Sequence, residues 1–189
     1  GLIGEILQTH ASHAIKQSWL KPLATGERLL GIAITEPEAG SDVSAIKMKA
    51  DKEGDEYVLN GEKSGISLAQ QADGFLVFAR TMPDCGASGV SAFIVPRDAS
   101  GVDIRGYADM GNVPIGRGSV FFDHVRIPED NLVGELNQGF KQVMNGFDFS
   151  RALIGLQCIG AAEQTLEETI EHVKERTSFG RPLAKYEGV

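Results

Sequence analysis

The sequence predicts an α+β protein in which a central antiparallel β-barrel or sandwich is flanked by helices. Near the N-terminus apolar residues recur at helical spacing, and the same spacing returns beyond residue 134. Between about residues 29 and 128 the pattern changes to short β-rich runs separated by glycine, proline, asparagine and aspartate. Because no helical segment interrupts these runs, they indicate antiparallel strands.

The N-terminal segment, from about residue 2 to residue 20, reads as one amphipathic helix. Its apolar positions have near-helical spacing and are Leu2, Ile3, Ile6, Leu7, His10, Ala14 and Trp19. Pro22 and Gly26 are expected to end this helix.

The β-rich segment contains six expected strands. They cover residues 29–35, 43–50, 57–59, 75–80, 91–95 and 119–125. Lys47 and Lys49 alternate with apolar residues, which predicts a strand with one face toward water. The dipeptide Asn60-Gly61 predicts a hairpin turn.

A second apolar face, from Phe140 to Val173, predicts one long helix that ends at about Arg176. Ser178 and Gly180 break the helical pattern. Within this chain, only the first helix and the sheet could pack against this apolar face. Much of the face would therefore contact nothing. We therefore expect the chain to be a fragment of a longer protein.

Composition and charge narrow the function classes. A hydrophobic content of 42% with 23% charged residues is ordinary for a globular protein. The formal net charge of -8 argues against nonspecific nucleic-acid binding, which needs a basic surface. No apolar run is long enough to span a bilayer and no basic leader opens the chain, so a soluble protein without a membrane partner is expected. Cys85 and Cys158 have no metal-ligand spacing, so no metal site is predicted, and Cys158 is expected to be buried.

The most informative stretch is residues 32–45, IAITEPEAGSDVSA, in which an apolar strand leads into a loop of small and polar residues. From the residues alone, such a loop is either an ordinary surface turn or a wrap around the edge of a cofactor. The segment resembles the signature that opens the middle β-domain of the acyl-CoA dehydrogenase family of flavoenzymes. Further blocks resemble the same family in the same order, at residues 55–63, 92–96 with 120–128, 146–151 and 175–180.

The resemblance implies a domain organisation. Residues 1–27 would end an N-terminal helical domain, residues 28–132 would form the middle β-domain, and residues 133–189 would begin a C-terminal helical bundle. The chain ends at Val189 within a motif, which agrees with the expectation of a fragment.

The resemblance also implies a function. Relatives use FAD to dehydrogenate an acyl-CoA thioester to the trans-2-enoyl-CoA and pass the electrons to an electron-transfer flavoprotein. Two alternatives stay open, namely an acyl-CoA oxidase of the same family and a truncated, non-catalytic ligand-binding module. A homodimer or homotetramer is expected, in the bacterial cytoplasm or the mitochondrial matrix.

The resemblance places the following residues at FAD: Ile32, Ile34, Thr35, Gly40, Ser41, Gly65, Ser67, Arg176, Ser178 and Phe179. The hydroxyl of Thr35 would bind the pyrimidine side of the isoalloxazine, and Ser67 would offer a hydroxyl to a flavin nitrogen. Gly65 stands where many relatives have a tryptophan that packs on the ring. Arg176 belongs to a segment that reaches the FAD pyrophosphate of a neighbouring subunit.

Four residues are expected at the acyl-CoA substrate: Ser41, Phe147, Asp148 and Arg151. The arginine would hold the anionic end of CoA, since a guanidinium matches phosphate geometry. Without the resemblance, Asp148 and Arg151 are typical of a surface ion pair. A minority of relatives have a glutamate base immediately before this arginine, whereas this chain has Ser150. We therefore predict no catalytic base in this chain.

Overall fold

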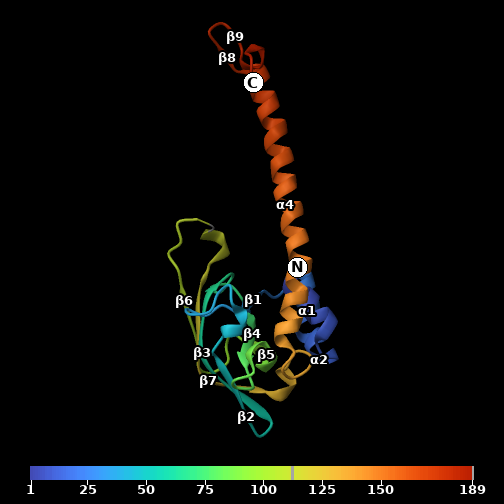
Figure 1. Ribbon diagram of the computed structural model, residues 1–189, viewed down its shortest axis with the longest axis vertical. Helices are drawn as coiled ribbons and strands as arrows, with labels where there is room; N and C mark the ends of the chain where they lie inside the picture. Colours follow the sequence, from blue (N-terminus) through green and yellow to red (C-terminus); the bar gives the residue numbers. More distant parts are fainter. Residues whose placement is uncertain (112, 189) are drawn as a thin grey trace. The chain divides into compact units, whose positions relative to one another are not determined.

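The computed structural model describes residues 1–111 and 113–188, so Val189, where the expected fragment ends, lies outside the described residues. The chain divides into two compact units, Gly1–Phe147 and a second that begins at Asp148. The first unit contains a curled mixed sheet with short helices beside it (Figure 1). The predicted α+β class, a central sheet flanked by helices, is confirmed.

The N-terminal segment is helical, but it is broken where one helix was predicted. It consists of α1 (Leu2–His10), α2 (His13–Ile15), a π-helical turn (Lys16–Leu20) and α3 (Lys21–Thr25). The chain turns after α1, and the Ser12 side chain accepts a hydrogen bond from the amide of Ile15 at 3.3 Å to start α2. Pro22 does not end the helix, because it lies in the first turn of α3. Gly26 does, in the left-handed conformation.

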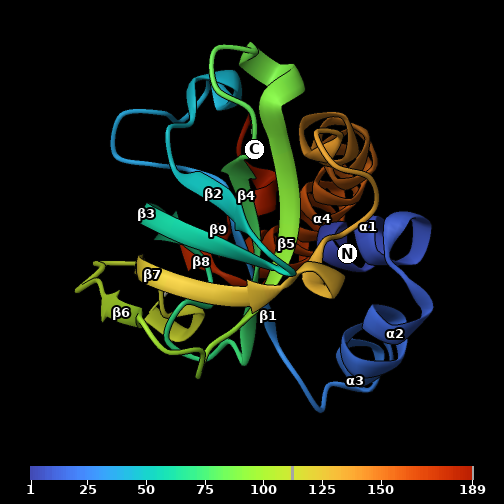
Figure 2. The same cartoon turned by 90° about the horizontal axis from the view of Figure 1, so that it is seen from below.

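Seven strands form the main sheet, in the order β1-β4-β2-β3-β7-β6, with β5 paired to β4. The strands are β1 (Leu30–Ala33), β2 (Lys49–Glu53), β3 (Glu56–Ile66), β4 (Gly74–Arg80), β5 (Val90–Pro96), β6 (Val102–Gly106) and β7 (Gly118–Pro128). Most neighbours are antiparallel, as predicted, but β4 runs parallel to both β1 and β2. Figure 2 shows α1, α2 and α3 together on one side of this sheet.

Two local strand predictions were wrong. Val43–Ala45 forms a 3-10 turn rather than a strand, because the Asp42 side chain accepts the amide of Ser44 at 3.1 Å and caps the turn. Asn60-Gly61 lies inside β3, where the register with β7 shifts, and the hairpin between β2 and β3 turns at Gly54 instead. Asn60 accepts the amide of His124 at 2.8 Å through its side chain, which suits a β-bulge.

The sheet separates two apolar cores. Alternate residues of β4 point to opposite faces, so Phe75 packs in one core and Leu76 in the other. The second core also contains Ile6 and Leu7 of α1, both fully buried. Burial on both faces explains why β4 reads as a continuous apolar run.

The predicted long helix is confirmed as α4 (Gly139–Glu175). In the first unit it buries Gly139, Gln142, Val143 and Gly146. In the second unit many apolar side chains are exposed, namely Phe149, Leu153, Ile154, Leu156, Ile159, Leu166 and Ile170. Cys158 is also exposed, so its predicted burial is wrong. Over the described residues, no helix is both long and apolar enough to cross a membrane.

Candidate functional site

The candidate site forms where the end of β1 meets the second half of β3. The amide of Ser64 donates to the carbonyl of Thr35 at 2.8 Å, and the Lys63 ammonium donates to the carbonyl of Ile34 at 2.8 Å. Two segments that lie about thirty residues apart are thereby joined side by side. Ile34 is buried and Thr35 is exposed, so the Thr35 hydroxyl is available to a ligand.

Glu36 and Lys63 form a buried ion pair at this junction. The Lys63 ammonium lies 2.8 Å from Glu36 Oε1, and the two side chains are 0% and 8% exposed. The same carboxylate accepts the amides of Lys47 at 2.6 Å and Met48 at 3.0 Å. The Glu36 side chain therefore links three segments: the one that follows β1, strand β3, and the residues just before β2.

Burial lowers the pKa of Lys63 to about 8, and the charge and hydrogen bond of Glu36 oppose the shift. At pH 7 most Lys63 side chains are therefore still protonated. The predicted site residues include neither Lys63 nor Glu36. A lysine in a strand is normally exposed, so the sequence pattern alone contains no signal for this pair.

An apolar cavity of about 490 Å³ is lined by residues of β1, of the segment that follows β3 and of the N-terminal helical segment (residues 1–4, Leu20, Leu23 and Ala24). Ile32 and Ser67, both predicted flavin contacts, line it together with Leu30 and Leu68. A flat aromatic ring with one polar edge needs apolar walls and a few hydroxyl groups at one side. These residues fit one flank of an isoalloxazine, with Ser67 as the polar group.

Gly65 lies next to a polar group that the sequence prediction missed. Its φ is +65°, and its amide donates to the Tyr107 hydroxyl at 3.0 Å. A Cβ atom at Gly65 would lie 3.3 Å from Arg117 Nη2, and Arg117 pairs with Asp109 at 3.6 Å. Backbone strain and the guanidinium together oppose a tryptophan at this position. The motif of the resemblance gave no signal for Tyr107 or Arg117, which come from the loop between β6 and β7.

The loop after Thr35 places Gly40 and Ser41 at the surface. No described atom lies within 4 Å of an ideal Cβ on Gly40, so its surroundings do not require a glycine. Exposure leaves the Ser41 hydroxyl accessible from solvent. Their predicted contacts with FAD and substrate stay predictions.

The predicted substrate residues lie on α4. Phe147 is partly buried at the end of the first unit. In the second unit, Asp148 and Arg151 form an exposed ion pair one turn apart. The contacts of these residues with CoA stay predictions.

Arg176, Ser178 and Phe179 lie at a small hairpin formed by β8 (Thr177–Ser178) and β9 (Arg181–Pro182). The hairpin is tied to the segment that follows, because the Tyr186 hydroxyl donates to the Ser178 carbonyl at 2.6 Å. Phe179 has a φ of +48° and is 96% exposed. A bulky residue in this conformation with an exposed ring is unusual. Its predicted contact with FAD stays a prediction.

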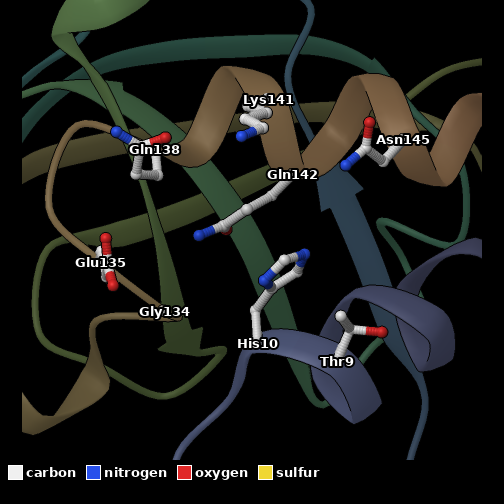
Figure 3. Close-up of a pocket in the computed structure, with 8 residues that line it drawn as sticks. All are labelled: Thr9, His10, Gly134, Glu135, Gln138, Lys141, Gln142 and Asn145. Carbon is white, nitrogen blue, oxygen red and sulfur yellow. The ribbon is translucent and has the colours of Figure 1, made fainter.

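Figure 3 shows a different cavity, between the end of α1 and the start of α4. Its volume is about 370 Å³, and it is lined by Thr9, His10, Gly134, Glu135, Gln138, Lys141, Gln142 and Asn145. His10 and Gln142 both extend into the space between the two helices, and the Gln142 amide nitrogen donates to the Val133 carbonyl at 3.1 Å. Gln142 Oε1 is buried without a hydrogen-bond partner among the described residues. None of the predicted site residues lines this cavity. In the described part of the chain, no group of three His, Cys, Asp or Glu side chains could hold a metal ion.

Comparisons with known proteins identify the family. The profile described as "Acyl-CoA dehydrogenase, middle domain" matches residues 31–125, and "Acyl-CoA dehydrogenase, C-terminal domain" matches residues 137–189. The chain is 36% identical, over 92% of its length, to caffeyl-CoA reductase-Etf complex subunit CarC of Acetobacterium woodii. It is 40% identical, over 95% of its length, to L-prolyl-[peptidyl-carrier protein] dehydrogenase of Pseudomonas fluorescens. It covers 46% and 48% of these two proteins.

Solved structures agree with the sequence matches. Butyryl-CoA dehydrogenase from Megasphaera elsdenii superimposes with a TM-score of 0.93 at 34% identity, over 98% of this chain and 49% of that one. The chain thus spans about half the length of the relatives that it matches. The two profiles cover both the sheet and α4, in the order that the sequence motifs indicated. The chain therefore belongs to the acyl-CoA dehydrogenase family.

Proposed function

We propose that the protein carrying this sequence is an FAD-dependent acyl-CoA dehydrogenase. It would convert an acyl-CoA thioester to the trans-2-enoyl-CoA and pass the electrons to an electron-transfer flavoprotein. One observation carries the proposal: the bond from Ser64 to Thr35 joins the segments that contain Thr35 and Ser67, and Ile32 and Ser67 of these two segments line one apolar cavity. Hydroxyl groups at the border of an apolar wall suit a flavin ring.

When bound, FAD supplies the acceptor for the hydride that leaves the substrate. The residues of this chain would hold and orient that cofactor. Thr35 and Ser67 would hydrogen-bond the polar parts of the ring, while Ile32 would form part of its apolar wall. Gly40 and Ser41 would leave room for the remainder of the cofactor, and the Ser41 hydroxyl would also contact the substrate.

The residues of α4 and of the small hairpin would bind the CoA part of the substrate and the FAD of a second subunit. Phe147 and Asp148 would line the pantetheine channel, and Arg151 would bind the anionic end of CoA. Arg176 would bind the FAD pyrophosphate of a second subunit, together with Ser178 and Phe179, so a homodimer or homotetramer is proposed. The catalytic base is assigned to no residue of this chain. We also propose that residues 1–27 end an N-terminal helical domain, residues 28–132 form the middle β-domain and residues 133–189 begin a C-terminal helical bundle.

The test is to purify the protein carrying this sequence, measure its FAD content, and add acyl-CoA esters of different chain types without oxygen. We expect a flavoprotein whose flavin absorbance bleaches with a suitable ester, but not with the corresponding free acid. Re-oxidation by an electron-transfer flavoprotein then tests the proposed electron acceptor. A colourless protein that cannot be reconstituted with FAD would refute the proposal. Flavin that no acyl-CoA ester reduces would refute the dehydrogenase reaction alone.

A further inference from the structure

The buried ion pair of Glu36 and Lys63 lies at the junction of β1 and β3, and its two charged groups have different further partners. The Glu36 carboxylate is held by Lys63 and by the amides of Lys47 and Met48. The Lys63 ammonium is also bonded to a backbone carbonyl, that of Ile34, at 2.8 Å. The positive charge is therefore in direct contact with the peptide that links Ile34 to Thr35.

The Lys63 ammonium contacts one side of this peptide only, through the Ile34 carbonyl. Like the other described peptide bonds, this one is trans, so the Ile34 carbonyl and the Thr35 N–H point in opposite directions. Since the carbonyl faces the Lys63 ammonium, the Thr35 N–H faces away from it. The proposed function places Thr35 at the pyrimidine edge of the flavin, and this inference rests on that placement.

We propose that Lys63 is a positioning residue that acts through the Ile34–Thr35 peptide and favours the reduced flavin over the oxidised flavin. A charged donor on a carbonyl polarises the peptide, and this strengthens the N–H on its other side as a donor. Two-electron reduction adds negative charge to the pyrimidine half of the ring. A stronger donor there, with a fixed positive charge behind it, stabilises the reduced form more than the oxidised form.

The location of the pair supports this role. A buried ion pair adds little net stability, because the cost of removing both charges from water offsets their attraction. The pair has no net charge, but its positive end is bonded to the Ile34 carbonyl in a nearly dry interior, where electrostatic interactions are strong. The pKa of Lys63, about 8, keeps that charge on the side chain at pH 7.

The test compares two double variants of the holoenzyme. Lys63→Met with Glu36→Gln removes the buried pair without leaving an unpaired charge. Lys47→Met with Glu38→Gln removes an exposed pair of the same region, whose atoms lie 2.5 Å apart and whose side chains are each 75% exposed. Both the dissociation constant for oxidised FAD and the two-electron midpoint potential are measured.

We expect the buried-pair variant to bind reduced flavin about tenfold more weakly relative to oxidised flavin, which lowers a two-electron potential by about 30 mV. The exposed-pair variant should keep the wild-type potential. Weaker FAD binding with an unchanged potential would overturn the proposal, since it would show a purely structural brace. A wild-type protein without FAD would overturn the proposed function as well, so the two failures are distinguishable.

A second measurement on the wild type covers the case in which the buried-pair variant does not fold. The midpoint potential is followed from pH 7 to pH 9.5. Among the described residues, Glu36 is the charged group bonded to Lys63, and β7 presents Val120 opposite Lys63. Lys47 is bonded to the same carboxylate through its backbone amide, and its side chain pairs with Glu38. Loss of the Lys63 proton above pH 8 should make the potential fall more steeply with pH in that range. A slope that does not change near pH 8 would contradict the role of Lys63.

Discussion

The buried pair of Glu36 and Lys63 should make the free energy of unfolding depend on pH, because Lys63 loses its proton more easily in the folded protein than in the unfolded chain. The pKa of Lys63 is about 8 in the folded protein, against 10.5 for an ordinary lysine. The unfolded chain therefore binds more protons between these two pH values, and the free energy of unfolding rises with pH there. The whole span corresponds to about 3 kcal/mol, of which about 2 kcal/mol falls between pH 7 and pH 9.5.

The assay is urea unfolding of the wild type and of Lys63→Met with Glu36→Gln at several pH values, followed by circular dichroism. The wild-type free energy of unfolding, minus that of the variant, should rise by about 2 kcal/mol from pH 7 to pH 9.5. Other lysines and tyrosines titrate in both proteins, so the difference isolates the buried pair.

The matched control is Lys47→Met. The hydrogen bond from Lys47 to Glu38 raises the pKa of that exposed lysine, so it stays charged over the whole range and the difference should remain flat. A flat difference for the buried pair as well would refute the reasoning, because it would mean that Lys63 titrates as an ordinary lysine.

Two further predictions concern the proposed contacts with ligands. Arg151→Ala should weaken CoA-ester binding and Arg176→Ala should weaken FAD binding, each by roughly ten- to a hundredfold, because a charge-assisted contact contributes about 1.5 to 3 kcal/mol. Calorimetry with both ligands checks this, and equal effects of both variants on both ligands would contradict the assignment. Gly65→Trp should lower stability by about 1 to 3 kcal/mol, since φ is +65° and the new side chain meets Arg117. Gly40→Ala, which enters open space, should have little effect on thermal unfolding, and equal shifts for the two variants would contradict this account.

The parts of the fold predicted most accurately were those with a regular apolar pattern inside a single helix or strand. The apolar period of 3.6 residues identified α4 over its whole length, because a long regular pattern has few alternatives. The run of apolar residues at β4 was equally clear, since both of its faces are buried. The break in the N-terminal helix was missed because the Ser12 cap competes locally with a continuous helix.

Pairing between distant segments was less predictable. The parallel alignment of β1 with β4 joins residues that are more than forty positions apart, and no local pattern encodes it. Asn60-Gly61 has the composition of a hairpin, but tertiary pairing with β7 overrides that preference and turns it into a bulge. Local turn chemistry is therefore a weak guide inside a long strand.

The candidate site was predicted in part. The motif identified the segments around Thr35 and Ser67, and the structure brings those segments together through the bond from Ser64 to Thr35. It could not identify Lys63, because the sequence does not show that a lysine in a strand faces a buried glutamate. The roles of the predicted residues in binding FAD and CoA remain predictions.

A crystal structure of the holoenzyme with FAD bound is the most direct test of the central claim. We expect the isoalloxazine beside the junction of β1 and β3, with Thr35 Oγ1 and Ser67 Oγ within hydrogen-bond distance of the ring and Lys63 still bonded to the Ile34 carbonyl behind it. A flavin ring that contacts neither hydroxyl, or that lies in the polar cavity near His10 and Gln142, would contradict the account.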